Sequence, residues 1–124
     1  MAEQKIKLLV VEDNKIIRNL IRMTFIREPE IEVFEAENGA DGFKLFQELH
    51  PDIVLSDIMM PGEMDGLSLC REIKASNNPC YVILVSGNGQ QNDIDLGMQA
   101  GADLYKVKPI RPTELISIVK AYLD

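Results

Sequence analysis

The sequence is poor in the residues that build several common kinds of site. It has two cysteines, Cys70 and Cys80, and one histidine, so neither a disulfide framework nor a zinc cluster fits it. No apolar run approaches the length of about 20 residues that a membrane-spanning helix needs. Lys5 and Lys7 interrupt the first apolar stretch, which argues against a secretory signal. These absences favour a cytoplasmic protein without disulfides.

Positive charge is also scarce relative to negative charge. Thirteen Lys and Arg stand against 20 Asp and Glu, which gives a formal net charge of −7. Binding to nucleic acid or to anionic membranes needs a cationic surface, so we expect no direct binding to either. The length of 124 residues suits one domain, residues 1–124, and the 6% of aromatic residues indicates an aliphatic core.

Short apolar runs alternate with longer amphipathic segments along the chain. The apolar runs predict strands at 6–11, 31–35, 53–55, 81–85 and 104–107. The amphipathic segments predict helices at about 14–28, 39–49, 67–74, 92–100 and 112–123. Alternation of this kind indicates an α/β fold, a parallel sheet with helices on both faces and right-handed crossovers.

Residues that cap or break helices support these boundaries. Pro29 closes the first helix, and Asn38 is expected to cap the second. The dipeptide His50-Pro51 ends the second helix, and Gly101 suits a left-handed end to the fourth.

Polar and charged residues follow the predicted strands at their carboxyl ends. They are Glu12 and Asp13 after the first strand, Asp57 after the third, Ser86 after the fourth and Lys108 after the fifth. In open parallel sheets the carboxyl ends of the strands meet at one edge, so we expect these side chains to converge. Three neighbouring carboxylates repel one another unless a cation compensates them. Oxygen ligands without His or thiolate favour Mg²⁺, completed by waters and a phosphate oxygen.

Together, and in this order and spacing, these residues resemble the receiver domain of two-component response regulators. The resemblance covers essentially the whole chain. Besides the acidic pair it rests on Asp57 with Met60-Pro61 after it, on Ser86-Gly87, on the run 101–105 and on Lys108-Pro109. It implies a flavodoxin-like (CheY-like) fold, a doubly wound five-stranded parallel sheet with strand order 2-1-3-4-5.

The resemblance also implies roles for the acidic residues and the lysine. Asp57 matches the phospho-acceptor, a carboxylate nucleophile that forms an acyl phosphate. Glu12, Asp13, Asp57 and the backbone carbonyl of Met59 match the ligands of Mg²⁺. Lys108 matches the lysine that, with the metal, neutralises charge on the transferring phosphoryl group.

Two further residues match the conformational switch of the family. Ser86 matches the hydroxyl that moves to bond a phosphoryl oxygen, and Tyr105 matches the aromatic ring that turns inward with it. In the family this change repacks the surface of the fourth helix, fifth strand and fifth helix, which partners contact. Pro109 would follow a cis peptide bond.

The implied function is a phosphorelay signalling switch, which would catalyse only its own phosphorylation and slow dephosphorylation. The phosphoryl donor would be a sensor histidine kinase or a histidine phosphotransfer protein. The switch would control a downstream protein or a fused output domain. The sequence leaves undecided whether phosphorylation produces a dimer. We expect no output domain within this sequence, which therefore either acts alone or is the N-terminal part of a longer regulator.

The sequence departs from the family pattern at three places. The loop at 60–66 has one residue more than usual after the acceptor, Gly87 stands where alanine is common, and Lys106 stands where an apolar residue is usual. These departures bear on kinetics and on the choice of partner rather than on the acceptor.

Other classes of protein fit the sequence less well. A phosphatase of the haloacid-dehalogenase type needs a second Asp two residues after the nucleophile, where this chain has Met59. The acidic strand ends would repel the phosphate of FMN in a flavodoxin-like carrier. A receiver used only as a scaffold would normally lack Asp57, the acidic pair or Lys108, and all are present. The pair Gly87 and Gly89 lacks the third glycine of a dinucleotide loop.

Overall fold

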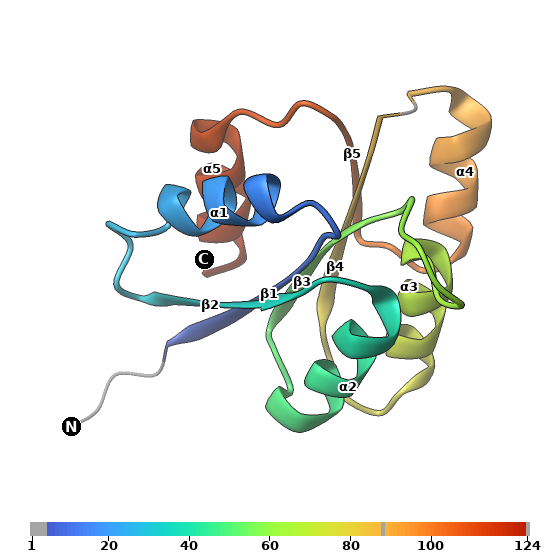
Figure 1. Cartoon of the computed structure of the whole chain (residues 1–124), viewed down its shortest axis with the longest axis horizontal. Helices are drawn as coiled ribbons and strands as arrows, with labels where there is room; N and C mark the ends of the chain where they lie inside the picture. The colour runs from blue at the N-terminus through green and yellow to red at the C-terminus, as the bar shows by residue number, and fades with distance from the viewer. Residues whose placement is uncertain (1–4, 88, 124) are drawn as a thin grey trace.

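The computed structural model describes residues 5–87 and 89–123, in which strands and helices alternate (Figure 1). The strands are β1 (Ile6–Val11), β2 (Ile31–Ala36), β3 (Ile53–Asp57), β4 (Tyr81–Ser86) and β5 (Leu104–Val107). The helices are α1 (Lys15–Thr24), α2 (Gly39–Leu49), α3 (Gly66–Ala75), α4 (Gln91–Gln99) and α5 (Pro112–Leu123). The predicted elements are therefore confirmed, with ends that shift by a few residues. The largest difference is in the first helix, which ends at Thr24 and is not closed by Pro29 as predicted. No helix in the described ranges is long and apolar enough to cross a membrane.

The strands form one parallel sheet in the order β2-β1-β3-β4-β5, which confirms the predicted doubly wound arrangement. Because β1 pairs with β2 on one side and β3 on the other, the order reverses direction at this strand. This reversal is the topological switch point, and ligand sites of such sheets form beside it at the carboxyl ends of the strands.

Two apolar clusters fill the space between the sheet and the helices. Alternate residues of β1 point to opposite faces, so Leu9 and Val11 join one cluster and Leu8 and Val10 the other. The first cluster packs against α2 and α3 and continues to the end of α4, and the second packs against α5 and the end of α1. Figure 1 shows α1 and α5 over one face of the sheet and α2 and α3 over the other. Both faces are thus covered, as the nearly continuous apolar strands predicted.

Side chains cap three of the helices at their N-termini. The Asn38 side chain accepts a hydrogen bond from the backbone N–H of Asp41, at 2.8 Å, which confirms the predicted cap of α2. Asn14 accepts from the N–H groups of the first turn of α1, and Asp65 accepts from the N–H of Ser68 in α3. These caps fix where each helix starts after its strand.

Polar contacts attach α1 to the sheet. Its apolar residues are spaced at helical period, yet no residue of α1 is buried. Arg18 and Arg22 both pair with the carboxylate of Glu35 on the edge strand β2. Arg18 also donates to the backbone oxygen of Glu12, at 2.7 Å. These arginine contacts attach the helix to the edge of the sheet, and Ile21 adds packing against the second apolar cluster.

His50 ends α2 in the left-handed region, with φ 50° and ψ 59°. A residue with a Cβ is strained there and glycine is not, so we expect His50→Gly to raise the free energy of unfolding by about 1 kcal/mol. For a domain of this size that gain is an increase in Tm of about 3–5 °C, measured by circular dichroism. His50→Ala is the matched control, because it removes the imidazole and keeps the strain. Equal stability of the two variants would contradict the assignment of strain.

Candidate functional site

The carboxyl edge of the sheet brings the predicted acidic residues together. Glu12 directly follows β1 and donates its backbone N–H to Ala36, at 3.0 Å, while Asp57 is the last residue of β3. Because β1 and β3 are hydrogen-bonded neighbours, the two carboxylates start from adjacent strand ends. One oxygen of each of Glu12, Asp13 and Asp57 lies within 4.8 Å of the others.

Burial makes this carboxylate cluster electrostatically costly. Glu12 is 4% exposed and Asp57 is 9% exposed, whereas Asp13 lies on the surface. Burial raises the pKa of Glu12, and the neighbouring Asp13 and Asp57 raise it further. The backbone N–H of Asn14, 3.1 Å from Glu12 Oε2, opposes this rise only in part. A cluster of three carboxylates with no thiolate or imidazole is the donor set of a hard divalent cation, so these residues fit Mg²⁺.

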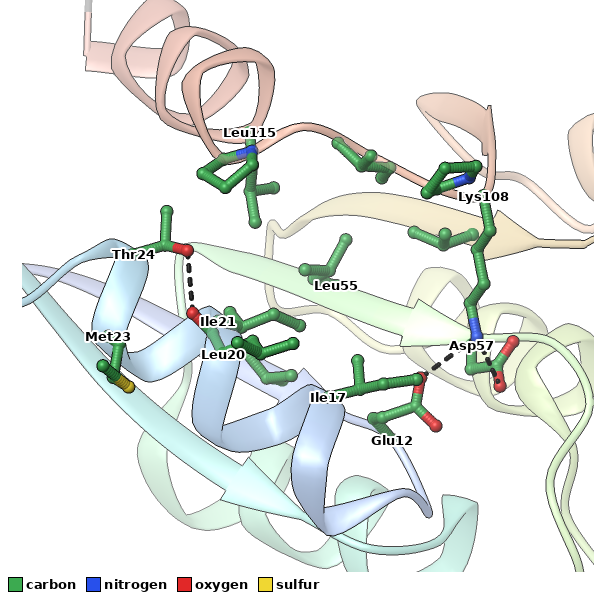
Figure 2. Close-up of a pocket in the computed structure, with 15 residues that line it drawn as sticks. Glu12, Ile17, Leu20, Ile21, Met23, Thr24, Leu55, Asp57, Lys108 and Leu115 are labelled. Atoms are coloured by element: carbon green, nitrogen blue, oxygen red, sulfur yellow. Dashed lines mark hydrogen bonds and ion pairs between the residues drawn. The ribbon is translucent and has the colours of Figure 1, made fainter.

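Lys108 reaches into this cluster from the loop after β5. Its Nζ lies 3.2 Å from Asp57 Oδ2 and 3.2 Å from Glu12 Oε1, as Figure 2 shows. Burial alone would lower the pKa of Lys108, but Asp57 and Glu12 outweigh it and raise that pKa. Lys108 therefore stays protonated beside the predicted acceptor.

The loop after Asp57 folds back tightly onto the end of β3. The N–H of Gly66 donates to the backbone oxygen of Ile58, at 2.9 Å. A Cβ on Gly66 would lie 2.2 Å from the backbone oxygen of Asp57, so only glycine fits this contact. The sequence does not predict this contact of Gly66, because a single glycine at a helix start carries no signal of what it touches. Met59 lies in the same loop with an exposed side chain, and its carbonyl stays a predicted metal ligand.

Ser86 and Tyr105 lie on the same face of the sheet. In the pairing of β4 with β5, Leu84 is opposite Tyr105 and Ser86 is opposite Val107, and side chains two residues apart on a strand share a face. Ser86 is buried, and the half-buried Tyr105 ring packs against the apolar cluster on the α2–α3 side. The backbone N–H of Lys108 donates to the oxygen of Ser86, at 2.8 Å, which joins these residues to the carboxylate cluster.

The peptide bond between Lys108 and Pro109 is cis, as the resemblance implied. Cys70 and Cys80 are free thiols away from the carboxylate cluster. Burial raises the pKa of Cys70 to about 11 and that of Cys80 to about 12, so both stay protonated. Protonated thiols of this kind act as small apolar side chains.

An apolar cleft of about 550 Å³ opens between α1, the sheet and α5 and ends at the carboxylate cluster. Ile21 of α1, Leu55 of β3 and Leu115 of α5 line it from three sides (Figure 2). Glu12, Asp57 and Lys108 lie at one end. The sequence did not predict this cleft, because it depends on how far α1 stands from the sheet.

The order of the strands and the acidic, lysine-paired site at the switch point define a doubly wound α/β domain of the flavodoxin-like class. The family model that describes the response regulator receiver domain matches residues 8–120 of this chain. The chain therefore belongs to the receiver domain family of two-component response regulators, which are signalling domains.

Similar proteins agree with this family. The transcriptional regulatory protein ResD from Bacillus subtilis is 39% identical over 94% of this chain and 48% of its own length. AfsQ1 from Streptomyces coelicolor, also a transcriptional regulatory protein, is 34% identical over 94% of this chain and 50% of its own length. The chain thus spans about half the length of these curated relatives.

Solved structures show the same fold. A CheY-like receiver domain protein from Methanospirillum hungatei superposes with a TM-score of 0.88 at 26% identity, over 98% of this chain and 95% of that one. The receiver domain of the Francisella response regulator 1452 gives 0.87 at 30% identity, over 95% and 96%. The chemotaxis protein CheY4 from Vibrio cholerae gives 0.86 over 95% and 98%, and at 22% identity it supports the fold alone.

The carboxylate cluster predicts a stabilising effect of Mg²⁺. At about a hundredfold excess over its dissociation constant, Mg²⁺ should raise the Tm by about 8–13 °C, because it binds the folded cluster and not the unfolded chain. Asp13→Asn should remove most of this shift, since it takes one charged ligand away. Glu32→Gln, an exposed change on β2, is the matched control and should keep the shift. The same shift in the wild-type and Asp13→Asn proteins, measured by circular dichroism, would exclude the cluster as the binding site.

Proposed function

We propose that this chain is a phosphorylation switch in which Asp57 accepts a phosphoryl group. The proposal rests above all on the position of the Asp57 carboxylate, 3.2 Å from the Lys108 ammonium and within the cluster that includes Glu12 and Asp13. Membership of the receiver family supports it. The phosphoryl donor would be a sensor histidine kinase or a histidine phosphotransfer protein.

The transfer would be a nucleophilic displacement at phosphorus. A carboxylate oxygen of Asp57 attacks the phosphorus of a phosphohistidine, the P–N bond breaks, and the new O–P bond makes an acyl phosphate. The imidazole leaves with the electron pair of the broken bond. Hydrolysis would return the carboxylate and release inorganic phosphate. The domain would in this way catalyse only reactions of its own side chain.

The chain's own charges would position the phosphoryl group. Lys108 is protonated and already paired with Asp57, so its flexible stem allows the ammonium to follow a phosphoryl oxygen. Glu12, Asp13 and Asp57, with the carbonyl of Met59, would hold Mg²⁺. When bound, this ion neutralises negative charge on the phosphoryl oxygens.

Ser86 and Tyr105 would carry the change to the surface. Asp57 is paired with Val85 in the sheet, so the buried Ser86 follows directly beside the acceptor strand. Its hydroxyl would bond a phosphoryl oxygen, and the Tyr105 ring on the same face would move inward. We infer that α4, β5 and α5 form the surface on which a downstream protein or a fused output domain reads this state.

Intact mass spectrometry tests the acceptor. After incubation with acetyl phosphate and Mg²⁺, the wild-type protein should gain one phosphoryl group, and EDTA should prevent the gain. Asp57→Asn should abolish it, because the amide is not a nucleophile of comparable strength. The control is Asp52→Asn, which changes a carboxylate at the other end of the same strand. A phosphoryl adduct that persists in Asp57→Asn would overturn the assignment. If the wild-type protein gains no adduct and does not respond to beryllofluoride, a scaffold role is favoured instead.

The exposed apolar face of α1 supports a protein donor. Ile16, Leu20 and Met23 follow one another at helical spacing and are 71%, 59% and 65% exposed. Leu20 and Met23 also line the cleft that ends at Asp57. A donor histidine must come within bonding distance of the Asp57 carboxylate, so the protein that carries it covers surface next to this end of the sheet. We infer that a helical donor protein buries the apolar face of α1.

Substitution of Leu20 separates docking from chemistry. Leu20→Glu should slow phosphotransfer from a phosphorylated histidine kinase about tenfold or more, because it places a charge in the centre of the buried contact. Its reaction with acetyl phosphate should not change, since this small donor needs no docking surface. Met98→Glu, a change at a 46% exposed apolar residue on α4, is the matched control. Equal slowing in both variants would place the donor elsewhere.

A further inference from the structure

Helix α4 meets the rest of the domain through a glycine. Gly97 is the buried residue of α4, and the flanking side chains of Leu96 and Met98 are 40% and 46% exposed. Gln90 at the N-cap makes no side-chain capping bond. The backbone of the helix therefore comes close to the sheet at Gly97, while the side chains of Asp93 and Ile94 are half-buried.

The ring of Tyr105 occupies the space that a side chain at Gly97 would need. A Cβ built on Gly97 would lie 2.6 Å from Cδ2 and 3.0 Å from Cε2 of Tyr105. It would also lie 3.5 Å from Cδ1 of Leu84, the residue opposite Tyr105 in the sheet. Carbon atoms in van der Waals contact stay about 3.5–4.0 Å apart, so any side chain here forces the ring or the helix to move.

The missing side chain of Gly97, and not a special backbone conformation, is what this contact uses. Positive φ angles occur at Gly62 and Gly101 among the described glycines, whereas Gly97 lies within a regular helix. A glycine in the middle of a helix lowers helix stability relative to alanine. The Tyr105 ring packs closely on Gly97, a contact that we call the Tyr105 seat. This packing is a physical reason why the helix tolerates the loss of stability that the glycine causes.

We propose that Gly97 is a positioning residue that couples the Tyr105 ring to α4. In the unphosphorylated protein the ring is seated on Gly97, and this seat sets the distance between α4 and the sheet. When the ring moves, α4 loses its closest contact and shifts or loosens. This inference rests on the proposed function, because it supplies the step between Tyr105 and the surface that partners read.

Gly97→Ala tests the seat through the accessibility of Tyr105. The chain has three tyrosines and no tryptophan, so Tyr81→Phe with Tyr122→Phe leaves Tyr105 as the one tyrosine fluorophore. In this background we expect Gly97→Ala to raise acrylamide quenching of the unphosphorylated protein about twofold, because the methyl group displaces the ring from its seat. Gln99→Ala, an exposed change on the same helix, should leave the quenching unchanged.

Hydrogen exchange of α4 distinguishes coupling from helix propensity. Propensity alone predicts that Gly97→Ala slows amide exchange in residues 91–99. The coupling predicts the reverse, exchange about threefold faster, because the helix is pushed from the sheet. In a Tyr105→Ala background, Gly97→Ala should slow the exchange of α4, since no ring then opposes the methyl group. The double variant should therefore exchange more slowly than Tyr105→Ala alone. Far-UV circular dichroism confirms that each variant is folded.

The outcomes separate this inference from the proposed function. Unchanged quenching in Gly97→Ala, or slower exchange with and without the Tyr105 ring, would overturn the coupling. These measurements use unphosphorylated protein and stand whether or not Asp57 is phosphorylated. If beryllofluoride with Mg²⁺ changes the exchange of α4 in the wild-type protein and changes it less in Gly97→Ala, the seat transmits the state of Asp57. An equal response in both proteins would show that it does not.

Discussion

The repulsion among Glu12, Asp13 and Asp57 is the constraint on which the functional edge of the domain depends. Hydrogen bonding of β1 to β3 fixes where two of these carboxylates start, so they cannot separate without breaking the centre of the sheet. Lys108 offsets part of this charge from the loop after β5. An excess of negative charge of this kind favours a divalent cation, and in the proposed function that cation would offset the charge of a phosphoryl group. The chemistry thus follows from a charge imbalance that the fold enforces.

The sheet separates two surfaces that have different tasks in the proposed switch. On the side of α1 and α5, an apolar cleft leads to Asp57 and gives a protein donor its path. On the other side, Tyr105 and Gly97 link the end of β4 to α4. Ser86 and Lys108 stand between them and are joined by a backbone hydrogen bond. In the proposed switch, input and output would share the strand ends and α5, whereas α1 would serve input alone and α4 output alone.

The sequence predicted the features that depend on local pattern. The apolar runs predicted the strands, and the charged residues that end those runs predicted Glu12, Asp57 and Lys108 as site residues. The structure brings the Lys108 ammonium within hydrogen-bonding distance of both carboxylates. The features it did not predict depend on contacts through space. Gly66 and Gly97 look alike in the sequence, yet one admits a backbone oxygen and the other an aromatic ring. The periodicity of α1 showed an apolar face but not that Arg18 would bind Glu35 and leave that face exposed.

The attachment of α1 has a consequence for the response of the domain to its medium. Ion pairs between Arg18, Arg22 and Glu35 hold this helix, and the Arg22 side chain is 51% exposed. Added salt screens such pairs, with a Debye length of about 8 Å at physiological ionic strength. Helix α5 is held by apolar packing through Leu115 and Val119 and also by ion pairs, Lys120 with Glu28 and Glu114 with Lys106. Added salt should therefore weaken the polar attachments of both walls of the cleft and leave their apolar packing in place.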